Sequence, residues 1–341
     1  MLSTIFLILC AFISAWFSSY LVQRYAVQLH LIQVPNHRSS HHQPTPHGGG
    51  IGIIMGFLSI SFWLLWQAQL NYPLFLTVIA LALVIALTSL IDDLWHLSIR
   101  IRLSIHCAAS LLLILGLSNL VVYDPLDIGG LPIQIAIFCL VVMSAWWINL
   151  FNFMDGIDGL AAMQAIFMLL AAGGLSLSMH PELYQQTLWL WMLYLAAATG
   201  GFLVLNWSPA KLFMGDIGST FLAFMLVFFT LVSIYLNWLN YAVWGILAAL
   251  FISDATVTLM RRIFTRQAWT KAHRSHAYQY LSRQWQSHQK VTLFYLLLNI
   301  IWLLPLAYLA LQQPHRQHIY LLIAYIPLLF LMYKGNAGKR E

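Results

Sequence analysis

Two adjacent aspartates, Asp92 and Asp93, end an apolar stretch in the sequence LIDDLWHLSIRIR. Neighbouring carboxylates repel each other unless a cation or a network of hydrogen-bond donors holds them. An acid at the C-terminus of a helix also opposes the helix dipole, so simple capping of the helix explains the pair poorly. The pair therefore predicts a site for a hard divalent ion, or a proton-accepting role.

A second polar group consists of Asn149, Asn152, Asp155 and Asp158, spaced three residues apart in WWINLFNFMDGIDGLAA. If the apolar helix before them continues through this segment, the spacing places all four side chains on one helix face. The glycine after each aspartate would instead favour a plain turn. Two amides and two carboxylates in so apolar a context favour a polar ligand, such as a nucleotide or a metal complex.

A single acid, Asp216, lies between Gly215 and Gly218 in the sequence KLFMGDIGST. Glycines on both sides permit a tight backbone that presents one carboxylate to a metal, while backbone N–H groups meet phosphate oxygens. Lys211 and the aromatic Phe213 precede the acid, and Phe213 is placed to stack on a base. Taken alone, this pattern is moderately specific for a metal–phosphate site.

The longest basic segment, residues 261–290, contains the sequence KAHRSHAYQ. Its His273, Arg274 and His276 would offer hydrogen-bond donors to an anion, and histidine also accepts or delivers a proton near neutral pH. For most of the other basic residues of the segment, Arg283 among them, contact with anionic lipid is the simpler interpretation.

Several other features receive structural interpretations. Residues 34–53, VPNHRSSHHQPTPHGGGIGI, combine helix-breaking prolines with a run of glycines. The glycines permit close backbone approach at the start of a helix, although a flexible loop explains them equally well. Asp254 lies in an apolar stretch and is predicted to be structural, paired with another helix or with Arg261. His106 and His288 are predicted to be packing or surface groups.

These residues belong to a chain that is too apolar for a soluble protein. Of its 341 residues, 61% are hydrophobic and 8% are charged, against about 25% charged in an ordinary soluble domain. This composition excludes a soluble enzyme and a nucleic-acid-binding domain of the usual basic kind. Since a bilayer requires about 20 apolar residues per helix, we expect an all-α polytopic integral membrane protein, with one domain over residues 1–341. About eleven transmembrane helices are predicted, near residues 3–23, 49–67, 73–91, 103–121, 131–149, 159–178, 187–206, 217–235, 238–260, 291–311 and 319–334.

The positively charged residues set the predicted orientation of these spans. When the loops are assigned alternately to the two faces, every Lys and Arg except Arg316 falls on one face. The positive-inside rule makes that face cytoplasmic, so the N-terminus is periplasmic and the C-terminus is cytoplasmic. The acids of the motifs lie in or beside the same loops. These cytoplasmic loops cover about residues 24–48, 92–102, 150–158, 207–216 and 261–290.

Two functions from other classes compete with an enzyme. An ion-coupled secondary transporter would place its acids near the bilayer midplane, in broken helices related by repeats. Here five of the ten acids gather at one face, and no repeat is apparent. A non-catalytic scaffold would have no reason to collect Asn, Asp, His and Gly at helix ends.

Taken in order, five segments resemble the polyprenyl-phosphate N-acetylhexosamine-1-phosphate transferases, glycosyltransferase family 4. The segments, spread over residues 34–285, are PNHRSSHHQPTPHGGG, DDLWHLSIRIR, NLFNFMDGIDGLAA, LNWSPAKLFMGDIGST and HRSHAYQ. The resemblance implies that undecaprenyl phosphate attacks the β-phosphorus of a UDP-N-acetylhexosamine and releases UMP. It also implies a requirement for Mg²⁺, with Mn²⁺ as the alternative ion. Such a transfer needs a metal ion and the positioning of two anions, but little covalent chemistry from the protein.

The resemblance implies catalytic roles for particular acids. Asp92, Asp93 and Asp216 correspond to the catalytic acids of the family, and Asp92 would accept the proton of the lipid phosphate or orient that phosphate. A phosphomonoester is mostly dianionic at neutral pH, with a second pKa of about 6, so both roles of Asp92 stay open. Asp216 corresponds to the metal-binding acid, and Asn152 is a further candidate ligand.

The remaining correspondences concern the substrates. The resemblance assigns the nucleotide site to Asn149, Asp155 and Asp158, with Phe213 stacking on uracil. It assigns the binding of pyrophosphate or sugar to His273, Arg274 and His276.

Departures from the family pattern indicate a branch. This chain has His96 where the peptidoglycan-forming branch has Lys, and HRSHAYQ where that branch has three consecutive histidines. It looks more like the branch that initiates O-antigen or common-antigen chains in the inner membrane of Gram-negative bacteria. The donor sugar stays open among N-acetylglucosamine, N-acetylgalactosamine and a 6-deoxy-N-acetylhexosamine.

Two further partners are considered. They are membrane lipid and a second copy of the chain, which would form a homodimer. Nucleic acid is not expected.

Overall fold

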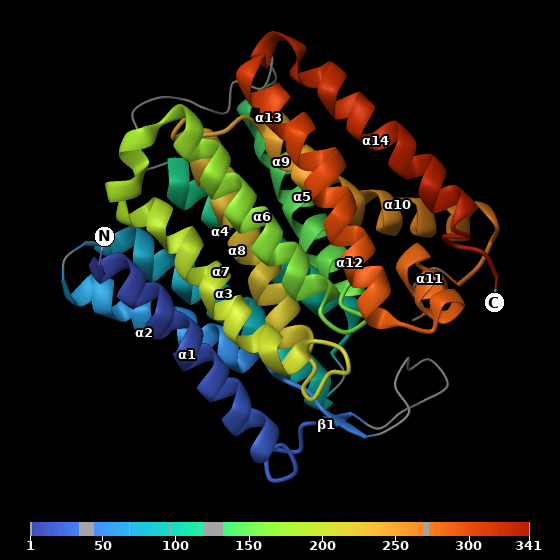
Figure 1. Ribbon diagram of the computed structural model, residues 1–341, viewed down its shortest axis with the longest axis horizontal. Coiled ribbons are helices and arrows are strands. Elements are labelled where there is room, and N and C mark those ends of the chain that lie inside the picture. Colours follow the sequence, from blue (N-terminus) through green and yellow to red (C-terminus); the bar gives the residue numbers. More distant parts are fainter. Residues whose placement is uncertain are drawn as a thin grey trace.

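The computed structural model describes residues 2–33, 44–67, 69–95, 97–118, 132–268 and 273–340. Over these ranges the chain is almost entirely helical. The strands here are β1 (Ile32–Gln33) and β2 (Thr45–Pro46), which form one short antiparallel pair. The prediction of an all-α protein is confirmed, and Figure 1 shows α1 and α2 at one end of the molecule and α11 and α14 at the other.

Fourteen α-helices follow one another along the described residues. The first eight are α1 (Leu2–Arg24), α2 (Gly50–Trp66), α3 (Tyr72–Trp95), α4 (Ile99–Ser118), α5 (Ile133–Phe153), α6 (Leu160–Met179), α7 (Thr187–Asn206) and α8 (Asp216–Tyr235). The others are α9 (Tyr241–Leu247), α10 (Ala249–Phe264), α11 (Ala277–Trp285), α12 (His288–Leu298), α13 (Leu304–Gln312) and α14 (Gln317–Lys334). A π-helical segment, Asn299–Leu303, joins α12 to α13 without a break in the spanning helix.

Nine helices of the described chain are long and apolar enough to cross a membrane. The pair α9 and α10, bent by 68°, makes a tenth if it is one span. The apolar helix α2 has 17 residues and is shorter than the others. Within the described residues, each of the eleven predicted stretches thus overlaps a helix, but nine helices, or ten with the bent pair, are long and apolar enough to be spans, against the eleven predicted.

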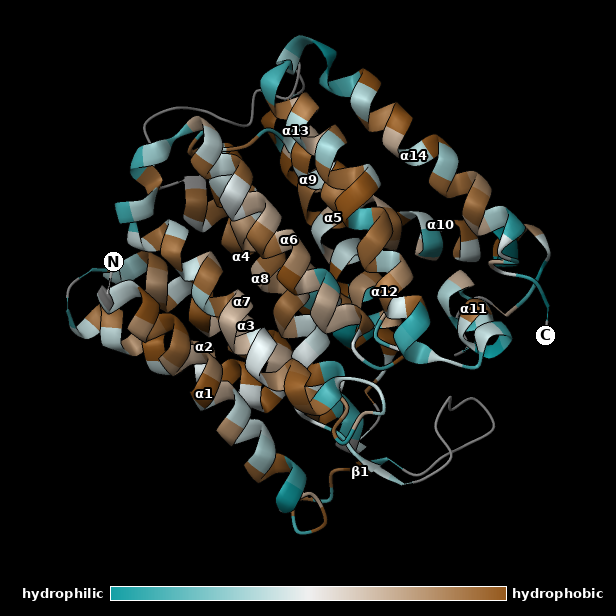
Figure 2. Cartoon of the chain, in the orientation of Figure 1, coloured by the Kyte–Doolittle hydropathy of each residue, from teal (hydrophilic) through white to brown (hydrophobic). Residues whose placement is uncertain are grey.

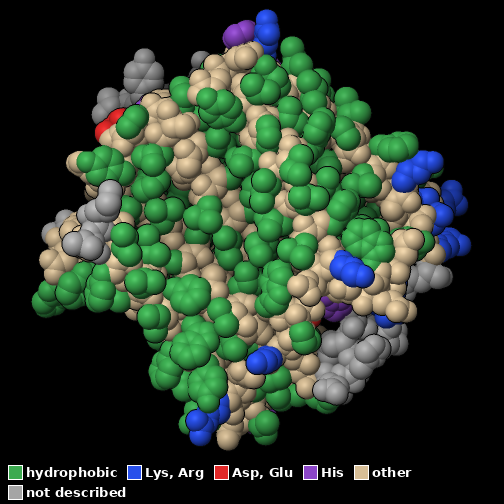
Figure 3. All heavy atoms as spheres, viewed as in Figure 1, with side chains coloured by type: hydrophobic (Ala, Val, Ile, Leu, Met, Phe, Trp, Pro, Cys, Tyr) green, Lys and Arg blue, Asp and Glu red, His purple; other side chains and the backbone are tan. Residues whose placement is uncertain are grey.

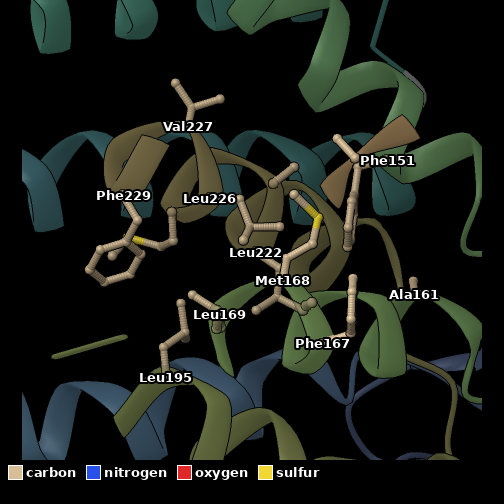
Figure 4. Close-up of a cluster of buried hydrophobic side chains, with 14 of the residues drawn as sticks. Phe151, Ala161, Phe167, Met168, Leu169, Leu195, Leu222, Leu226, Val227 and Phe229 are labelled. Atoms are coloured by element: carbon tan, nitrogen blue, oxygen red, sulfur yellow. The ribbon is translucent and has the colours of Figure 1, made fainter. Parts of the chain in front are cut away.

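The surface of the bundle suits lipid, and its centre is formed by α8. Large apolar side chains are exposed on the outer helices, for example Phe138 on α5 and Phe330 on α14. Figure 2 shows hydrophobic residues along the outer helices, and Figure 3 shows hydrophobic side chains over much of the visible face. In α8, by contrast, 83% of the most apolar stretch is buried, against 17% in α14. Figure 4 shows Leu222 and Leu226 of α8 among side chains of α5 and α6. The start of α8 is thus held at the centre of the bundle.

The glycine-rich start of α2 meets the start of α8 through backbone. The N–H of Gly49 donates to the carbonyl of Phe213, and that of Gly50 to Met214, both over 2.9 Å. A Cβ at Gly50 would overlap Gly218 Cα. Of the two interpretations of these glycines, close backbone approach is the one observed, and it fixes the segment that precedes Asp216.

Gly50→Ala is therefore expected to destabilise the protein by about 1–3 kcal/mol, because the added methyl group forces α2 away from α8. Gly174→Ala in α6 is the matched control, since no atom lies within 4 Å of the added Cβ. Alanine at that position should raise stability by up to about 1 kcal/mol through its higher helix propensity. Thermal unfolding in detergent measures both effects, and equal Tm values for the two variants would contradict this packing.

Candidate active site

Three predicted acids meet where α3 ends and α8 begins. Asp92 and Asp93 lie in the last turn of α3, and Asp216 is the first residue of α8. The carboxylate of Asp93 lies close enough to Asp92 and Asp216 for their charges to interact. The packing of α3 against α8 thus brings together acids from two separate sequence motifs.

Two donors from neighbouring helices stabilise this acidic group. Arg102 Nη1 of α4 forms an ion pair with Asp92 Oδ2. On α5, the amide of Asn152 donates to Ser219 Oγ over 2.9 Å and hydrogen-bonds to Asp216. Asn152 therefore acts as a donor that orients Asp216, and its role as a metal ligand stays a prediction. Sequence reasoning missed Arg102 because it counted this residue only toward the orientation of the spans.

The chemistry of the donor set fits Mg²⁺. The ion prefers oxygen ligands, and it is commonly held by one or two carboxylates together with substrate phosphates and water. Asp93 Oδ2 is buried and has no hydrogen-bond partner among the described residues, which leaves it available to a cation. In the described part of the chain, no three His, Cys, Asp or Glu residues form a complete metal site by themselves. An ion here would therefore depend on oxygens from a substrate or water.

The predicted polar ladder does not continue on one helix face. Helix α5 ends at Phe153, so Asn149 and Asn152 are helical, whereas Asp155 and Asp158 lie in the turn that follows. Gly159 adopts φ +75°, which a glycine tolerates and a helix does not. The turn separates the four side chains, and Asn149 Nδ2 lies 3.2 Å from His106 Nδ1 on α4.

Asp155 and Asp158 have opposite electrostatic environments. Burial raises the pKa of Asp155 well above its usual range, and the charges of Asp216 and Asp158 add to this effect. Burial also acts to raise the pKa of Asp158, but hydrogen bonding and the charge of His288 more than offset it, so the pKa of Asp158 is lowered. The charge of Asp155 therefore interacts with that of Asp216 in the acidic group, whereas the environment of Asp158 favours its ionised form.

The pair of Asp158 and His288 corrects the prediction that His288 is a packing or surface group. His288 Nδ1 lies 3.1 Å from Asp158 Oδ1, at the start of α12. The backbone N–H of Ala210 donates to Asp158 Oδ2 over 3.2 Å, and Thr292 Oγ1 donates to the Asp158 carbonyl over 3.0 Å. Asp158 thus ties the turn after α5 to α12 and to the loop that carries Phe213.

His47 is a site residue that the sequence interpretation did not single out. It lies close enough to Asp216 for their charges to interact, and burial lowers the pKa of His47 despite that negative charge. The signal for it was its position directly before the glycine run. Phe213 lies beside it, because the Phe213 N–H donates to the carbonyl of Pro46 over 2.9 Å.

Asp254 is structural, and of its two predicted partners, another helix or Arg261, the structure shows another helix, α11. Its carboxylate is fully buried and accepts the backbone N–H groups of Ala277 and Tyr278, over 2.9 and 3.0 Å. It also accepts the hydroxyl of Tyr295 over 2.9 Å. Asp254 thereby anchors the N-terminus of α11 to α10.

The histidines of HRSHAYQ are packed together at this anchor. The His276 ring stacks on that of His273, and its Nδ1 lies 3.3 Å from Asp254 Oδ1. Burial, followed by the charges of His276 and Arg262, lowers the pKa of His273 to about 3. His273 is therefore neutral at neutral pH and would meet an anion as a hydrogen-bonding group rather than as a cation.

Helix α11 also contacts the end of α5, directly before the turn that holds Asp155 and Asp158. Tyr278 OH donates to the carbonyl of Phe153, the last residue of α5, over 2.9 Å. Arg274 instead lines a cavity with residues that follow α14. The HRSHAYQ motif thus lies between the site and the C-terminal segment. Residues 34–43, His96 and Lys271, which entered the sequence interpretation, lie outside the described residues.

Comparison with known proteins identifies similar sequences. Residues 75–234 match the family described as Glycosyl transferase family 4. A Bacillus subtilis protein named "Probable undecaprenyl-phosphate N-acetylglucosaminyl 1-phosphate transferase" is 25% identical over 291 residues, which cover 82% of this chain and 78% of that protein. The "Decaprenyl-phosphate N-acetylglucosaminephosphotransferase" of Mycolicibacterium smegmatis is 31% identical over 237 residues, covering 64% of this chain and 57% of the relative.

A further relative matches over a shorter range. The "Phospho-N-acetylmuramoyl-pentapeptide-transferase" of Streptococcus thermophilus is 40% identical over 106 residues, which cover 30% of each chain.

The family match of residues 75–234 runs from α3 into α8. It therefore contains the acidic group and the turn after α5.

Asp158→Asn is expected to lower the free energy of unfolding by about 1–3 kcal/mol at neutral pH, because it removes the charge that pairs with His288. The pKa of Asp158 is lowered in the folded protein. Its contribution is therefore present above the unfolded-state pKa, about 3.9, and is lost as the pH falls through the folded-state pKa. The Tm difference between wild type and variant should shrink as the pH is lowered below about 4.

Glu182→Gln is the control for this experiment. Its pair with His180 spans 3.5 Å, and the carboxylate is 67% exposed, so little change in Tm is expected. If the effect of Asp158→Asn stayed constant down to pH 3, the ion pair would not be its source.

Proposed function

Because this chain belongs to the polyprenyl-phosphate N-acetylhexosamine-1-phosphate transferase family, we propose that it transfers N-acetylhexosamine 1-phosphate from a UDP-sugar to undecaprenyl phosphate. The products are undecaprenyl-diphospho-sugar and UMP. The observation that carries this proposal is the meeting of Asp92, Asp93 and Asp216 at helix ends, beside Asn152. A phosphate on a membrane lipid and a soluble nucleotide meet naturally at the ends of spanning helices.

In this reaction an oxygen of the lipid phosphate forms a bond to the β-phosphorus of the donor, and the bond from that phosphorus to the oxygen of UMP breaks. Mg²⁺, or Mn²⁺ in its place, would be held by Asp216 and Asn152 and would neutralise charge on the pyrophosphate. Asp93 offers a further carboxylate oxygen to the same position. Asp92, which is paired with Arg102, orients the lipid phosphate or accepts its proton.

The nucleotide is proposed to bind over the turn after α5. Asn149, Asp155 and Asp158 lie on or directly after the end of α5, and Phe213 would stack on uracil. The bond from Ala210 to Asp158 couples the loop of Phe213 to this turn. The pyrophosphate or sugar is assigned to His273, Arg274 and His276. The Nδ1 atom of His276 already faces the carboxylate of Asp254, so Asp254 orients the imidazole ring that would contact the substrate.

We further propose that the site faces the cytoplasm in the bacterial inner membrane and serves O-antigen or common-antigen initiation. The orientation is supported by the concentration of Lys and Arg in the loops on the side of the site. The branch is supported by HRSHAYQ in place of a histidine run. The match to the peptidoglycan enzyme, which covers 30% of the chain, does not outweigh this difference.

The test is Mg²⁺-dependent exchange of labelled UMP into UDP-N-acetylhexosamines by the purified full chain with undecaprenyl phosphate. We expect exchange with at least one of three donors: UDP-N-acetylglucosamine, UDP-N-acetylgalactosamine or a UDP-6-deoxy-N-acetylhexosamine. The donor with the highest exchange rate identifies the sugar. The absence of exchange with all three donors would reject the proposed reaction and favour the alternative function, an ion-coupled secondary transporter.

Asp216→Asn is expected to lower the exchange rate by at least about 100-fold, because it removes the carboxylate charge that would hold the metal ion at the reacting phosphates. Glu182→Gln, which changes an exposed acid outside the site, should leave the rate unchanged. The folded state of both variants is checked by thermal unfolding. Wild-type exchange by folded Asp216→Asn would remove Asp216 from the proposed metal site.

A further inference from the structure

A basic cavity, whose lining contains no residue of the acidic group, lies between α11 and the segment of residues 335–340 that follows α14. Its volume is about 250 Å³. The cations that line it are Arg274, Arg283, Lys339 and Arg340. Ser275 and Asn336 add polar groups to the wall, and none of the described residues that line it is acidic. Figure 1 shows α11 beside the C-terminal end of the chain, and Figure 3 shows blue side chains gathered on that side of the molecule.

The segment after α14 is fixed in place, so the cavity is a built feature. The N–H of Gly338 donates to the carbonyl of Ser275 over 2.7 Å. Arg261 Nη1 donates to the carbonyl of Ala337 over 3.1 Å, and Gln267 Nε2 to that of Gly338 over 3.0 Å. Gly338 has φ +73°, and a Cβ there would lie 2.7 Å from the Thr258 carbonyl oxygen. These contacts hold Lys339 and Arg340 against the start of α11.

The guanidinium groups are also positioned by the backbone. Arg283 Nη1 donates to the carbonyl of Arg274 over 2.9 Å, and Arg340 Nη2 donates to the carbonyl of Thr265 over 3.2 Å. Each guanidinium has five N–H donors, so one such bond orients the group and leaves other donors for a ligand. The positive charges of Arg283, Lys339 and Arg340 repel each other across the cavity, and an anion between them would reduce that repulsion.

The depth of the cavity indicates where this anion comes from. The spanning helix α14 ends at Lys334, and Asn336, Lys339 and Arg340 follow within six residues. Residues so close to the end of a spanning helix lie at the level of the lipid headgroups. Basic pockets beside helix ends on the cytoplasmic side attract the phosphates of anionic lipids.

We propose that this cavity binds the phosphate of an anionic phospholipid headgroup and so fastens α11 and the segment after α14 to the membrane surface. The bound group is a phosphodiester with one negative charge. Arg274 is also assigned to the proposed substrate site, but Arg283, Lys339 and Arg340 are not, and these three cations carry the lipid proposal independently of the transferase reaction.

The experiment titrates the detergent-solubilised full chain with dioctanoyl phosphatidylglycerol or dioctanoyl phosphatidylcholine and counts bound lipid by native mass spectrometry. We expect selective retention of phosphatidylglycerol. The double variant Arg283→Gln/Lys339→Gln should bind it about 30-fold more weakly, since each cation near an anionic lipid contributes roughly fivefold. Lys339→Gln alone should show about a fivefold loss, and it leaves the bond from Arg283 to Arg274 intact.

The matched control is Arg266→Gln/Lys290→Gln, which removes two exposed cations from the same group of loops without touching the cavity. It should bind phosphatidylglycerol like wild type, and UMP exchange should be unchanged in both double variants. Equal retention of the two lipids, or equal losses in the cavity and control variants, would overturn the proposal. Displacement of the lipid by millimolar inorganic phosphate or by UDP-N-acetylglucosamine would also overturn it, by assigning the cavity to free phosphate or to the sugar donor.

Discussion

The carboxylates of Asp92, Asp93 and Asp216 meet between the end of α3 and the start of α8, and like charges so placed repel each other. Arg102 and Asn152 offset part of this repulsion from two further helices. The remainder is sustained by packing, because α8 lies between α2, α3 and α5 and its first residue cannot move away. The buried core of the bundle thus supplies the free energy that holds the three acids together.

The surrounding turns and helices are arranged to keep this group in place. The turn after α5 is tied to α12 by Asp158 and to α11 by Tyr278. Helix α11 is in turn held by Asp254, an acid buried within the bundle. An unpaired charge buried within the bundle would cost free energy, and Asp254 is accordingly surrounded by hydrogen-bond donors. Its role is to hold α11 in place. Helix α11 therefore links the buried anchor at Asp254 to the turn beside the acidic group.

The sequence predicted the fold well because its signals are local. Runs of about 20 apolar residues specify helices in a bilayer whatever their neighbours are, and the predicted stretches are helical. The sequence also located the acids at helix ends, since Asp92 and Asp93 close one apolar run and Asp216 opens another. It left open whether the glycines before α2 serve flexibility or close contact, because that depends on what lies opposite them.

By itself, the sequence determined the solvent, the helices and the residue types available for chemistry, because composition and hydropathy report the environment of each segment. The tertiary structure alone decided the pairings. It placed Arg102 on Asp92, His288 on Asp158 and Asp254 on α11. It also ended α5 before Asp155, which replaced a helical ladder by a turn. These contacts join residues from different helices, and their energies depend on distance and burial that no local pattern of residues specifies.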